Sequence, residues 1–117
     1  MRIEVKGRNL TVSDELKERI HKRFHKVARQ VSDLAWMEVE LCEERNPSIH
    51  DSQVAEVTLY LKGVTLRAKE RSDSMIHSIN LLEEDLSRQV KRHRDKRRRR
   101  RESGRTTPAA PPRPAAP

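Results

Sequence analysis

The 117-residue chain has few of the residues on which several kinds of functional site depend. A single cysteine, Cys42, excludes a disulfide within the chain and a zinc site built from cysteines, and it fits a reducing compartment such as the cytosol. Three glycines are too few for a loop that cradles phosphate groups. Aromatic residues make up 3% of the chain, which leaves little means of reading splayed bases. No run approaches the roughly 20 apolar residues of a membrane span, and the opening MRIEVKGRNL lacks the apolar segment of a signal peptide.

The residue types that carry catalysis in other proteins form no coherent set here. His21 and His25 are four residues apart on a predicted helix, a spacing that can hold a metal, but no third ligand is placed to complete the site. Cys42 has no base beside it in the sequence and is an improbable nucleophile. We therefore expect no enzyme activity, no metal, no cofactor and no small-molecule substrate.

Positive charge is abundant and unevenly placed. The net charge is +8 at pH 7 and the isoelectric point is about 10.2. Residues 1–71 hold 14 basic and 12 acidic side chains, whereas residues 72–117 hold 12 and 6. The stretch RQVKRHRDKRRRRR, residues 88–101, alone has ten positive charges and one acid. Such an excess at one end predicts a polyanionic partner, either nucleic acid or an anionic membrane surface.

Apolar residues recur with the periods of four strands and two helices. Period two predicts strands over residues 2–7, 35–44, 55–61 and 64–68, the last two joined by a tight hairpin at Lys62–Gly63. Spacings of three and four predict one helix from Ser13 to Val31 and another from near Ser74 to at least His93. Each element has one apolar face. The predicted fold class is therefore α+β, with the order β-α-β-β-β-α and two helices packed on one face of a four-stranded sheet.

The sequence divides near residue 96. Residues 1–96 contain every apolar side chain larger than alanine and are expected to form one folded domain. Residues 97–117 begin with five arginines and end with TTPAAPPRPAAP, in which no apolar side chain is larger than alanine. Such a segment cannot bury enough surface to offset its ordering entropy, so residues 97–117 are predicted to be a basic and then Pro/Ala-rich disordered tail.

Both predicted helices carry a basic stripe beside their apolar stripe. The outer face of the predicted sheet carries Glu38, Glu40, Glu44 and Glu56 and is expected to repel phosphate. Recognition of folded RNA by shape and phosphate is therefore expected through the helices, rather than base stacking on the sheet. Charged helix stripes are also common as plain solvated surface, and the residues alone leave that interpretation open. The candidate RNA-contacting residues are Arg19, Lys22, Lys26, Arg29, Arg88, Lys91, Arg92 and Arg94.

Three segments carry a family resemblance that covers roughly residues 1–96. GRNLTVSDELKERIHKRF contains a GRN turn and a Ser-Asp helix start, and LRAKERSD has the form of a strand-to-helix junction. INLLEEDLSRQVKRHRDK is similar to the pattern I-D-x-x-x-x-K-L-x-R-Q-L-x-x-H-K-D. Together they resemble the hibernation promoting factor / ribosome-associated inhibitor A family, also described as sigma-54 modulation or ribosomal subunit interface proteins. The matching positions of the last segment are Ile79, Leu86, Arg88, Gln89, His93 and Asp95.

The resemblance implies a fold like that of a double-stranded-RNA-binding domain and a function in ribosome hibernation. Members of the family bind the small ribosomal subunit in stationary phase or stress, at the decoding channel across the aminoacyl and peptidyl tRNA sites. They contact 16S rRNA through basic helix faces and block tRNA and mRNA. The resemblance thus implies a bacterial, cytoplasmic translation inhibitor that binds the small subunit and the whole ribosome. It further implies no membrane partner, a monomer off the ribosome, and a short form without the family's C-terminal dimerisation domain.

The second helix departs from the family pattern. Its entry in the family reads Asp-Met-Tyr-x-Ala-Ile-Asp, whereas Ser74, Ile76 and Asn80 replace the two acids and the tyrosine here, and Asp85 stands where a lysine is common. We hypothesise that residues 94–101 replace the lost contacts. Two alternatives stay open: a general DNA- or RNA-binding protein driven by the arginine run, and a regulatory protein that contacts a sigma factor or another protein.

Overall fold

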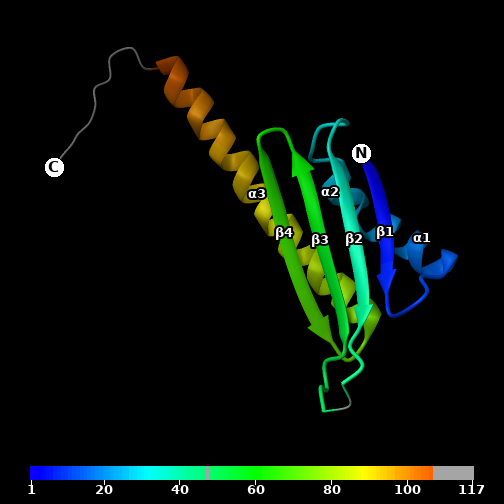
Figure 1. Ribbon diagram of the computed structural model, residues 1–117. Coiled ribbons are helices and arrows are strands. Elements are labelled where there is room, and N and C mark those ends of the chain that lie inside the picture. Colours follow the sequence, from blue (N-terminus) through cyan, green and yellow to red (C-terminus); the bar gives the residue numbers. More distant parts are fainter. Residues whose placement is uncertain (47, 107–117) are drawn as a thin grey trace.

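Seven helices and strands follow one another in the computed structural model, which describes residues 1–46 and 48–106, with side chains to Lys96. The predicted order β-α-β-β-β-α is confirmed, with the first helix divided in two. The elements are β1 (Arg2–Arg8), α1 (Asp14–Arg23), α2 (His25–Ala28), β2 (Trp36–Glu43), β3 (Gln53–Leu61), β4 (Val64–Ser72) and α3 (Met75–Thr106) (Figure 1).

The strands form one sheet in the order β1-β2-β3-β4. Strand β1 pairs in parallel with β2, and the other two pairings are antiparallel. Val5, Val39, Val57 and Ala68 are aligned across all four strands, and the last three are buried. Because side chains alternate between the faces of a strand, this row places every predicted apolar position on the same face.

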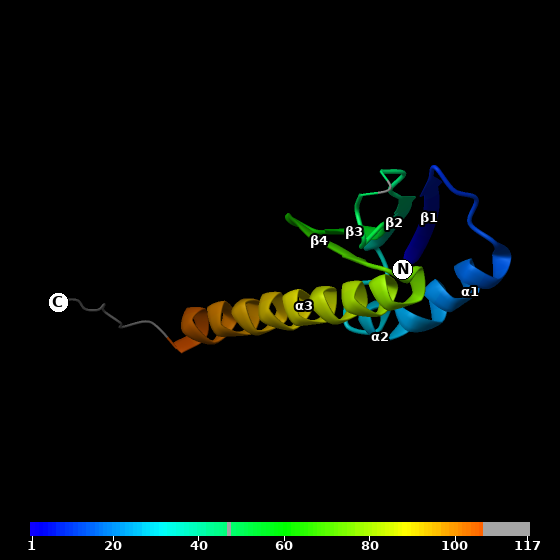
Figure 2. The ribbon, with the colours of Figure 1, turned by 90° about the horizontal axis from the view of Figure 1, so that it is seen from below.

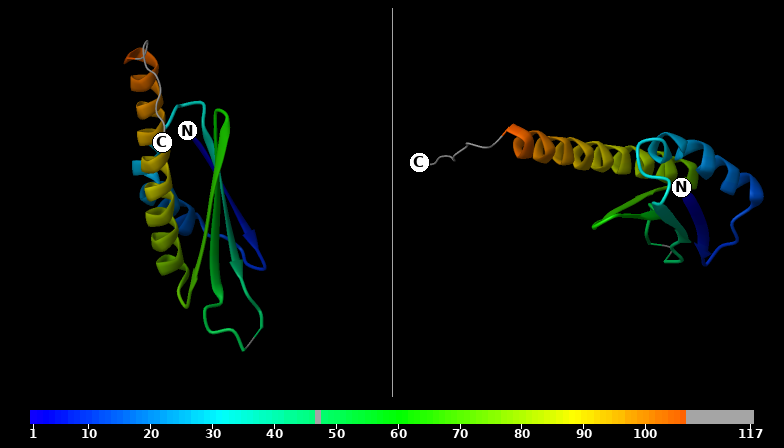
Figure 3. Two further views of the ribbon diagram at one scale, coloured as in Figure 1. Left: turned by 90° about the vertical axis from the view of Figure 1, so that its left-hand side faces the viewer. Right: turned by 90° about the horizontal axis from the view of Figure 1, so that it is seen from above.

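The three helices cover that apolar face and leave the other face of the sheet bare (Figures 2 and 3). The apolar stripes predicted from the spacing of three and four are the ones that the structure buries. Burial of apolar surface at this interface is the main stabilising contribution to the fold. The apolar helical side chains that are 0–2% exposed, among those described, are Ile20, Phe24 and Val27 from α1, α2 and their junction, and Ile79, Leu82, Leu86 and Val90 from α3.

The first helix is interrupted at Phe24, which the apolar periodicity did not predict. Phe24 has φ −87° and ψ 2°, outside the helical range, and its side chain is fully buried. Two backbone hydrogen bonds still cross the interruption, from the Phe24 N–H to the Ile20 carbonyl (2.9 Å) and from the Ala28 N–H to the Phe24 carbonyl (3.0 Å). The two short helices α1 and α2 therefore continue one apolar stripe across the sheet.

Two glycines are required by the backbone. A Cβ atom at Gly7 would overlap the Leu10 carbonyl oxygen, so the GRN turn after β1 can fold back only with glycine there. Asn9 in the same turn takes the left-handed conformation, with φ 64°. Gly63 has φ 80° and closes the β3–β4 hairpin between the paired residues Leu61 and Val64, as predicted.

Helix α1 begins with the predicted cap, since the Ser13 hydroxyl accepts a hydrogen bond from the Leu16 N–H at 3.1 Å. The entry of α3 is held by a buried serine pair that sequence reasoning missed. The Ser78 hydroxyl donates to the Gln53 carbonyl of β3 (2.6 Å) and lies 2.8 Å from the Ser72 hydroxyl at the end of β4. These buried hydroxyls join α3 to two strands at the point where the family pattern has alanine.

Helix α3 runs to Thr106, ten residues beyond the boundary predicted at residue 96, and projects past the end of the sheet (Figure 2). The predicted boundary therefore lies inside the helix. Apolar periodicity ends at Val90. Arginine, lysine and glutamate, which are good helix formers, make up most of the helical residues that follow, and the first glycine and proline after Val90 are Gly104 and Pro108. The rest of the predicted tail, residues 107–117, lies outside the described residues.

Substitution of Leu86 by alanine should lower the free energy of unfolding by about 2–5 kcal/mol, because Leu86 is fully buried between α3 and the sheet and the change leaves a cavity. Urea denaturation followed by circular dichroism measures this. Leu34→Ala is the matched control, since Leu34 is 93% exposed and the change should stay within about 0.5 kcal/mol. Equal losses in the two variants would contradict the assignment of the core.

Candidate nucleic-acid interface

All eight predicted RNA-contacting residues are exposed. Two lie on α1, one lies on α2, Arg29 follows α2 directly, and four lie on α3. None of the eight takes part in an ion pair with any side chain that the structure describes. Their charges are therefore not neutralised within the described part of the fold, which distinguishes this surface from a helix face covered by internal ion pairs.

Arg23 joins α1 to α3. Its Nε lies 3.3 Å from Glu83 Oε1 and one terminal nitrogen lies 3.7 Å from Glu84 Oε2, while the Glu83 Oε2 atom accepts a hydrogen bond from Ser87. The Nε atom is buried, and the contact with Glu83 is an ion pair without hydrogen-bond alignment. Arg23 therefore faces α3 and is structural, although nothing in its sequence position sets it apart from its basic neighbours.

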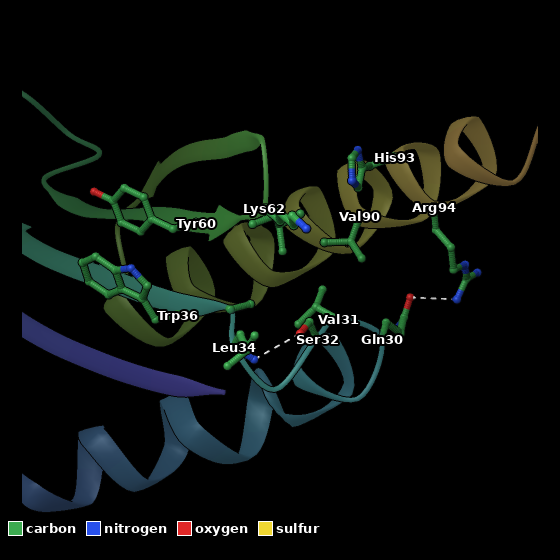
Figure 4. A pocket seen from close by; sticks show the side chains of 12 residues that line it. Gln30, Val31, Ser32, Leu34, Trp36, Tyr60, Lys62, Val90, His93 and Arg94 are labelled. Atoms are coloured by element: carbon green, nitrogen blue, oxygen red, sulfur yellow. Dashed lines mark hydrogen bonds between the residues drawn. The ribbon is translucent and has the colours of Figure 1, made fainter. Parts of the chain in front are cut away.

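The contact of Arg23 orients the basic stripe of α1. Residues three or four apart lie on the same side of a helix, so Arg19 and Lys26 share the side of Arg23 that faces α3. A second contact joins the helices further along, where the Arg94 guanidinium donates to Gln30 Oε1 at 3.3 Å (Figure 4). The residues of α3 between Glu83 and Arg94 consequently lie beside the residues between Arg23 and Gln30.

The basic residues of α3 do not all point the same way. At about 100° per residue, Lys91 lies about 60° from Arg94, which points toward α2, and about 60° from Arg88 in the other direction. Arg88 and Arg92, four residues apart, lie on the other side of the exposed face, toward β4. The eight residues thus all lie exposed on the helical layer, on α1, on α2 and the residue after it, and on α3. We call this set of eight residues the helix surface.

The outer face of the sheet differs from the expected acidic surface. Glu38, Glu40 and Glu56 point outward as predicted, with Glu4 beside them, but six basic residues lie on the two edge strands of the same face. The prediction counted the acids of the central strands and not these bases, which only the register brings together. The six are Arg2, Lys6 and Arg8 on β1 and Arg67, Lys69 and Arg71 on β4.

Two of the three bases of β1 are paired with acids on the neighbouring strand, and Arg2 is paired with Glu4 of β1 itself. Lys6 Nζ lies 2.6 Å from Glu38 Oε2, and a terminal nitrogen of Arg8 lies 3.5 Å from Glu40 Oε1. A hydrogen bond from the Lys6 ammonium to the Glu38 carboxylate, together with its negative charge, raises the pKa of Lys6. The central acids are thus largely compensated from the β1 side.

The two aromatic residues of the outer face form a stacked pair. The rings of Trp36 and Tyr60, directly opposite each other on β2 and β3, have centroids 4.2 Å apart and planes 13° apart (Figure 4). The Arg2 guanidinium lies 5.2 Å from the ring centroid of Trp36 and forms a cation–π contact with it. The Trp36 ring therefore contacts both Tyr60 and Arg2. The Tyr60 ring has no further aromatic or cation–π contact among the described residues.

A groove of about 650 Å³ opens where the loop after α2, the β3–β4 hairpin and α3 meet (Figure 4). Val31, Leu34 and Val90 contribute apolar wall, and Lys62 and Arg94 contribute positive charge. None of the described residues that line the groove is acidic. The groove lies at the end of the helix surface, where α3 leaves the sheet.

The expectation of a metal-free protein rests on the sequence, and the described residues offer no group of three or more histidine, cysteine, aspartate or glutamate side chains that could hold a metal. His21 and His25 are both exposed. Within the described residues, no helix combines the length and the apolarity that are needed to cross a membrane.

Glu70 and Asp85 bring two carboxyl groups together between β4 and α3. Burial raises the pKa of Glu70, the hydrogen bond and negative charge of Asp85 raise it further, and the positive charge of Arg88 lowers it. Gln89 holds Asp85 in place by donating from one amide nitrogen to Asp85 Oδ1 (3.2 Å) and to the Arg67 carbonyl (2.8 Å). The aspartate at a common lysine position of the family thus creates a like-charge contact inside the fold.

Residues 3–98 match the family model described as Sigma 54 modulation protein / S30EA ribosomal protein. The chain belongs to this family. It is similar to the ribosome hibernation promotion factor of Picosynechococcus sp., with 28% identity over 97 residues, 82% of this chain and 50% of the relative. It is 34% identical over 98 residues to the ribosome hibernation promotion factor of Staphylococcus aureus, covering 80% of this chain and 48% of the relative. The chain therefore spans about half the length of these curated relatives.

Two solved structures have the same fold. A ribosomal subunit interface protein from Coxiella burnetii superposes with a TM-score of 0.69 at 20% identity, over 81% of this chain and 99% of that chain. The N-terminal domain of Protein Y from Thermus thermophilus superposes with a TM-score of 0.69 at 24% identity, over 80% of this chain and 99% of that chain. These similarities confirm the predicted α+β architecture.

Substitution of Asp85 by asparagine should stabilise the protein at pH 7–8 and have little effect near pH 4. The raised pKa of Glu70 means that the folded protein holds this proton more tightly than the unfolded chain does. The corresponding stability is present below the ordinary carboxyl value of 4.5 and is lost as pH rises through the raised value. Asparagine removes the like charge and can still accept from Gln89. Thermal melting of both proteins from pH 4 to pH 8 measures the difference.

Asp95→Asn is the control, since Asp95 lies on the same helix and no described ion pair or side-chain hydrogen bond involves it. It should shift the melting temperature equally at all pH values in this range. A pH-independent effect of Asp85→Asn would show that the two carboxyl groups do not interact.

Proposed function

We propose that the protein is a ribosome hibernation and translation inhibition factor that binds the small ribosomal subunit at the decoding channel. The observation that carries this proposal is the helix surface, whose eight cations are exposed and have no ion-pair partner among the described residues. Membership of a family described as an S30EA ribosomal protein, and relatives named ribosome hibernation promotion factor, support the ribosome as the partner.

The mechanism proposed is occlusion without catalysis. Arginine and lysine side chains on α1, α2 and α3 contact the phosphates of 16S rRNA, while the sheet holds the helices at a fixed spacing. A double-helical RNA groove is read by its shape and phosphates, for which a rigid pair of helices is suited. The bound domain would then fill the aminoacyl and peptidyl tRNA sites and exclude tRNA and mRNA.

Reversal of two charges on the helix surface, Lys26→Glu with Lys91→Glu, should release the protein from small subunits at moderate salt. Lys26 lies on α2 and Lys91 on α3, so both helices lose a cation. Each lost phosphate contact should reduce the salt dependence, so the slope of log K against log salt should fall by about two. Co-sedimentation with small subunits on sucrose gradients across a salt series measures this.

Lys17→Glu with Arg45→Glu is the matched control, because both residues are exposed and lie outside the helix surface. The control should sediment with subunits like the unchanged protein. Competition separates the decoding channel from general nucleic-acid binding: initiation factors should displace the protein, and excess duplex RNA should not. Displacement by duplex RNA alone would favour a general RNA- or DNA-binding protein.

Removal of residues 97–117 should sharply weaken binding to the ribosome, because five of the lost residues are the consecutive arginines 97–101. Val90 is the last buried residue of α3 among the side chains described, to Lys96, so the truncated domain keeps the described core. A second truncation after Thr106 removes the Pro/Ala-rich segment and only one arginine, and it should bind almost normally. Unchanged co-sedimentation of the shorter protein would show that the helix surface is sufficient without the arginine run.

A further inference from the structure

The outward positions of β4 carry a second row of free positive charge. Thr65, Arg67, Lys69 and Arg71 alternate along the strand and are all exposed. Residues two apart in a strand are separated by about 6.6–6.8 Å, so the three cations form a line along the edge of the outer face. Ala68, which alternates with these residues, is buried under the helices, so the line lies on the opposite face of the sheet from α1 and α2.

The two edges of the outer face differ in their charge balance. On β1 each base has an acidic partner within 4 Å, such as Glu38 for Lys6. On β4, by contrast, no ion pair with any described side chain involves Arg67, Lys69 or Arg71. Glu38 and Glu40 are paired from β1, whereas Glu56 lies opposite Lys69 in the register and takes part in no ion pair with a described side chain. The three cations of the β4 edge therefore exceed this one neighbouring acid, and the edge keeps a net positive charge.

The backbone of β4 also offers donors. Strand β4 has only β3 as a neighbour, so its other edge is free of strand pairing. The Arg67 carbonyl accepts from the side chain of Gln89, which shows that the polar groups of Arg67 point to this free edge. Alternate residues of a strand direct their N–H groups to the same edge, so Lys69 and Arg71 present N–H donors beside their charged side chains.

An aromatic ring lies at the hairpin end of this line. Tyr60 stacks on Trp36 with one face, and its neighbour on the other side is Thr65, a small side chain on β4. A flat ring placed over Thr65 would continue the row that begins with Arg2 and Trp36. Nucleic-acid bases have the required flat π-face, whatever their sequence.

We propose that the outer edge of β4, formed by Arg67, Lys69 and Arg71, together with Tyr60 of the neighbouring strand β3, is a second RNA-binding surface that takes a single strand. Its phosphates follow the three cations and the free N–H groups, and one base stacks on Tyr60. The proposal takes from the proposed function only that RNA is the ligand. The helix surface and this edge would then hold two different segments of RNA on opposite faces of the domain.

Charged residues on an edge strand also deter pairing with other strands, and that role must be separated from RNA binding. Deterrence depends on the presence of charge and not on its sign. Replacement of Lys69 and Arg71 by glutamate keeps the edge charged but reverses the attraction for phosphate. The same variant therefore tests one role and preserves the other.

The test uses the full chain with Lys26→Glu and Lys91→Glu, which weakens the helix surface; its other six cations and the arginine run are the same in every variant that is compared. A fluorescein-labelled oligouridylate of about 12 nucleotides is the probe, in the size range of single-strand sites, and fluorescence anisotropy measures its binding across a salt series. Addition of Lys69→Glu and Arg71→Glu should weaken binding at least tenfold and lower the salt slope by about 1.4, for two contacts to a single strand. Tyr60→Leu should weaken binding about tenfold with an unchanged slope, since it removes stacking and no charge.

Lys17→Glu with Arg45→Glu, added to the same background, controls for the change in net charge. The milder pair Lys69→Gln and Arg71→Gln repeats the test should the glutamate variant fail to fold. The proposal is overturned if the β4 variants weaken binding no more than this control, or if an acidic peptide binds the edge and the oligouridylate does not. Ribosome co-sedimentation of the β4 variant with an intact helix surface reports separately on the proposed function, because it can persist when single-strand binding is lost.

Discussion

The structure depends on the burial of one face of the sheet under α1, α2 and α3. Every inward position of the four strands and every inward turn of the helices is used in this interface, with Phe24 and Leu86 among the fully buried side chains. Among the side chains that the structure describes, only two sets of polar contacts cross between the helices, at Arg23 and at Gln30. The spacing of the exposed cations is therefore set by the core, which also offsets their mutual repulsion, about 1 kcal/mol per pair at contact distance in water. A surface that repels itself in this way is arranged in advance for a polyanion.

Periodicity predicted the fold because it reports burial, and burial decides most of this architecture. Alternation in the strands and spacings of three and four in the helices placed Val39, Val57 and Ile79 on the correct faces. The method had no signal where burial ends or where geometry changes within a buried stripe. The interruption at Phe24 leaves the apolar spacing intact, so it is invisible in the sequence. The continuation of α3 past Val90 depends on helix propensity alone, which periodicity does not measure.

The candidate site was predictable in its exposure but not in its pairing. Sequence placed the basic stripes on the solvent side of both helices, and all eight residues are exposed there. It could not show that Arg23 lies in an ion pair with Glu83 while Lys22 and Lys26 remain free, because that depends on which side of α1 faces α3. The prediction of an acidic outer sheet face was incomplete for a related reason. Whether a base cancels an acid depends on the strand register, and Lys6 and Glu38 are 32 positions apart in the chain.

Helix α3 leaves the core at Val90 and continues to Thr106 with no described element packed on its last turns (Figure 1). Like charges three or four residues apart oppose a helix by roughly 0.2–0.5 kcal/mol per pair, and residues 94–101 contain several such pairs. We call residues 91–106 of α3 the arm. An isolated helix of about 16 residues is marginal in water, so the arm depends on the packed turns that precede it. A polyanion along the arm would remove the repulsion and stabilise the helix. Binding and helix formation would then reinforce each other, and salt would act on both: it screens the repulsion within the arm while it weakens the attraction to phosphate. For the proposed function, this makes the arm a continuation of the helix surface rather than a separate basic tail.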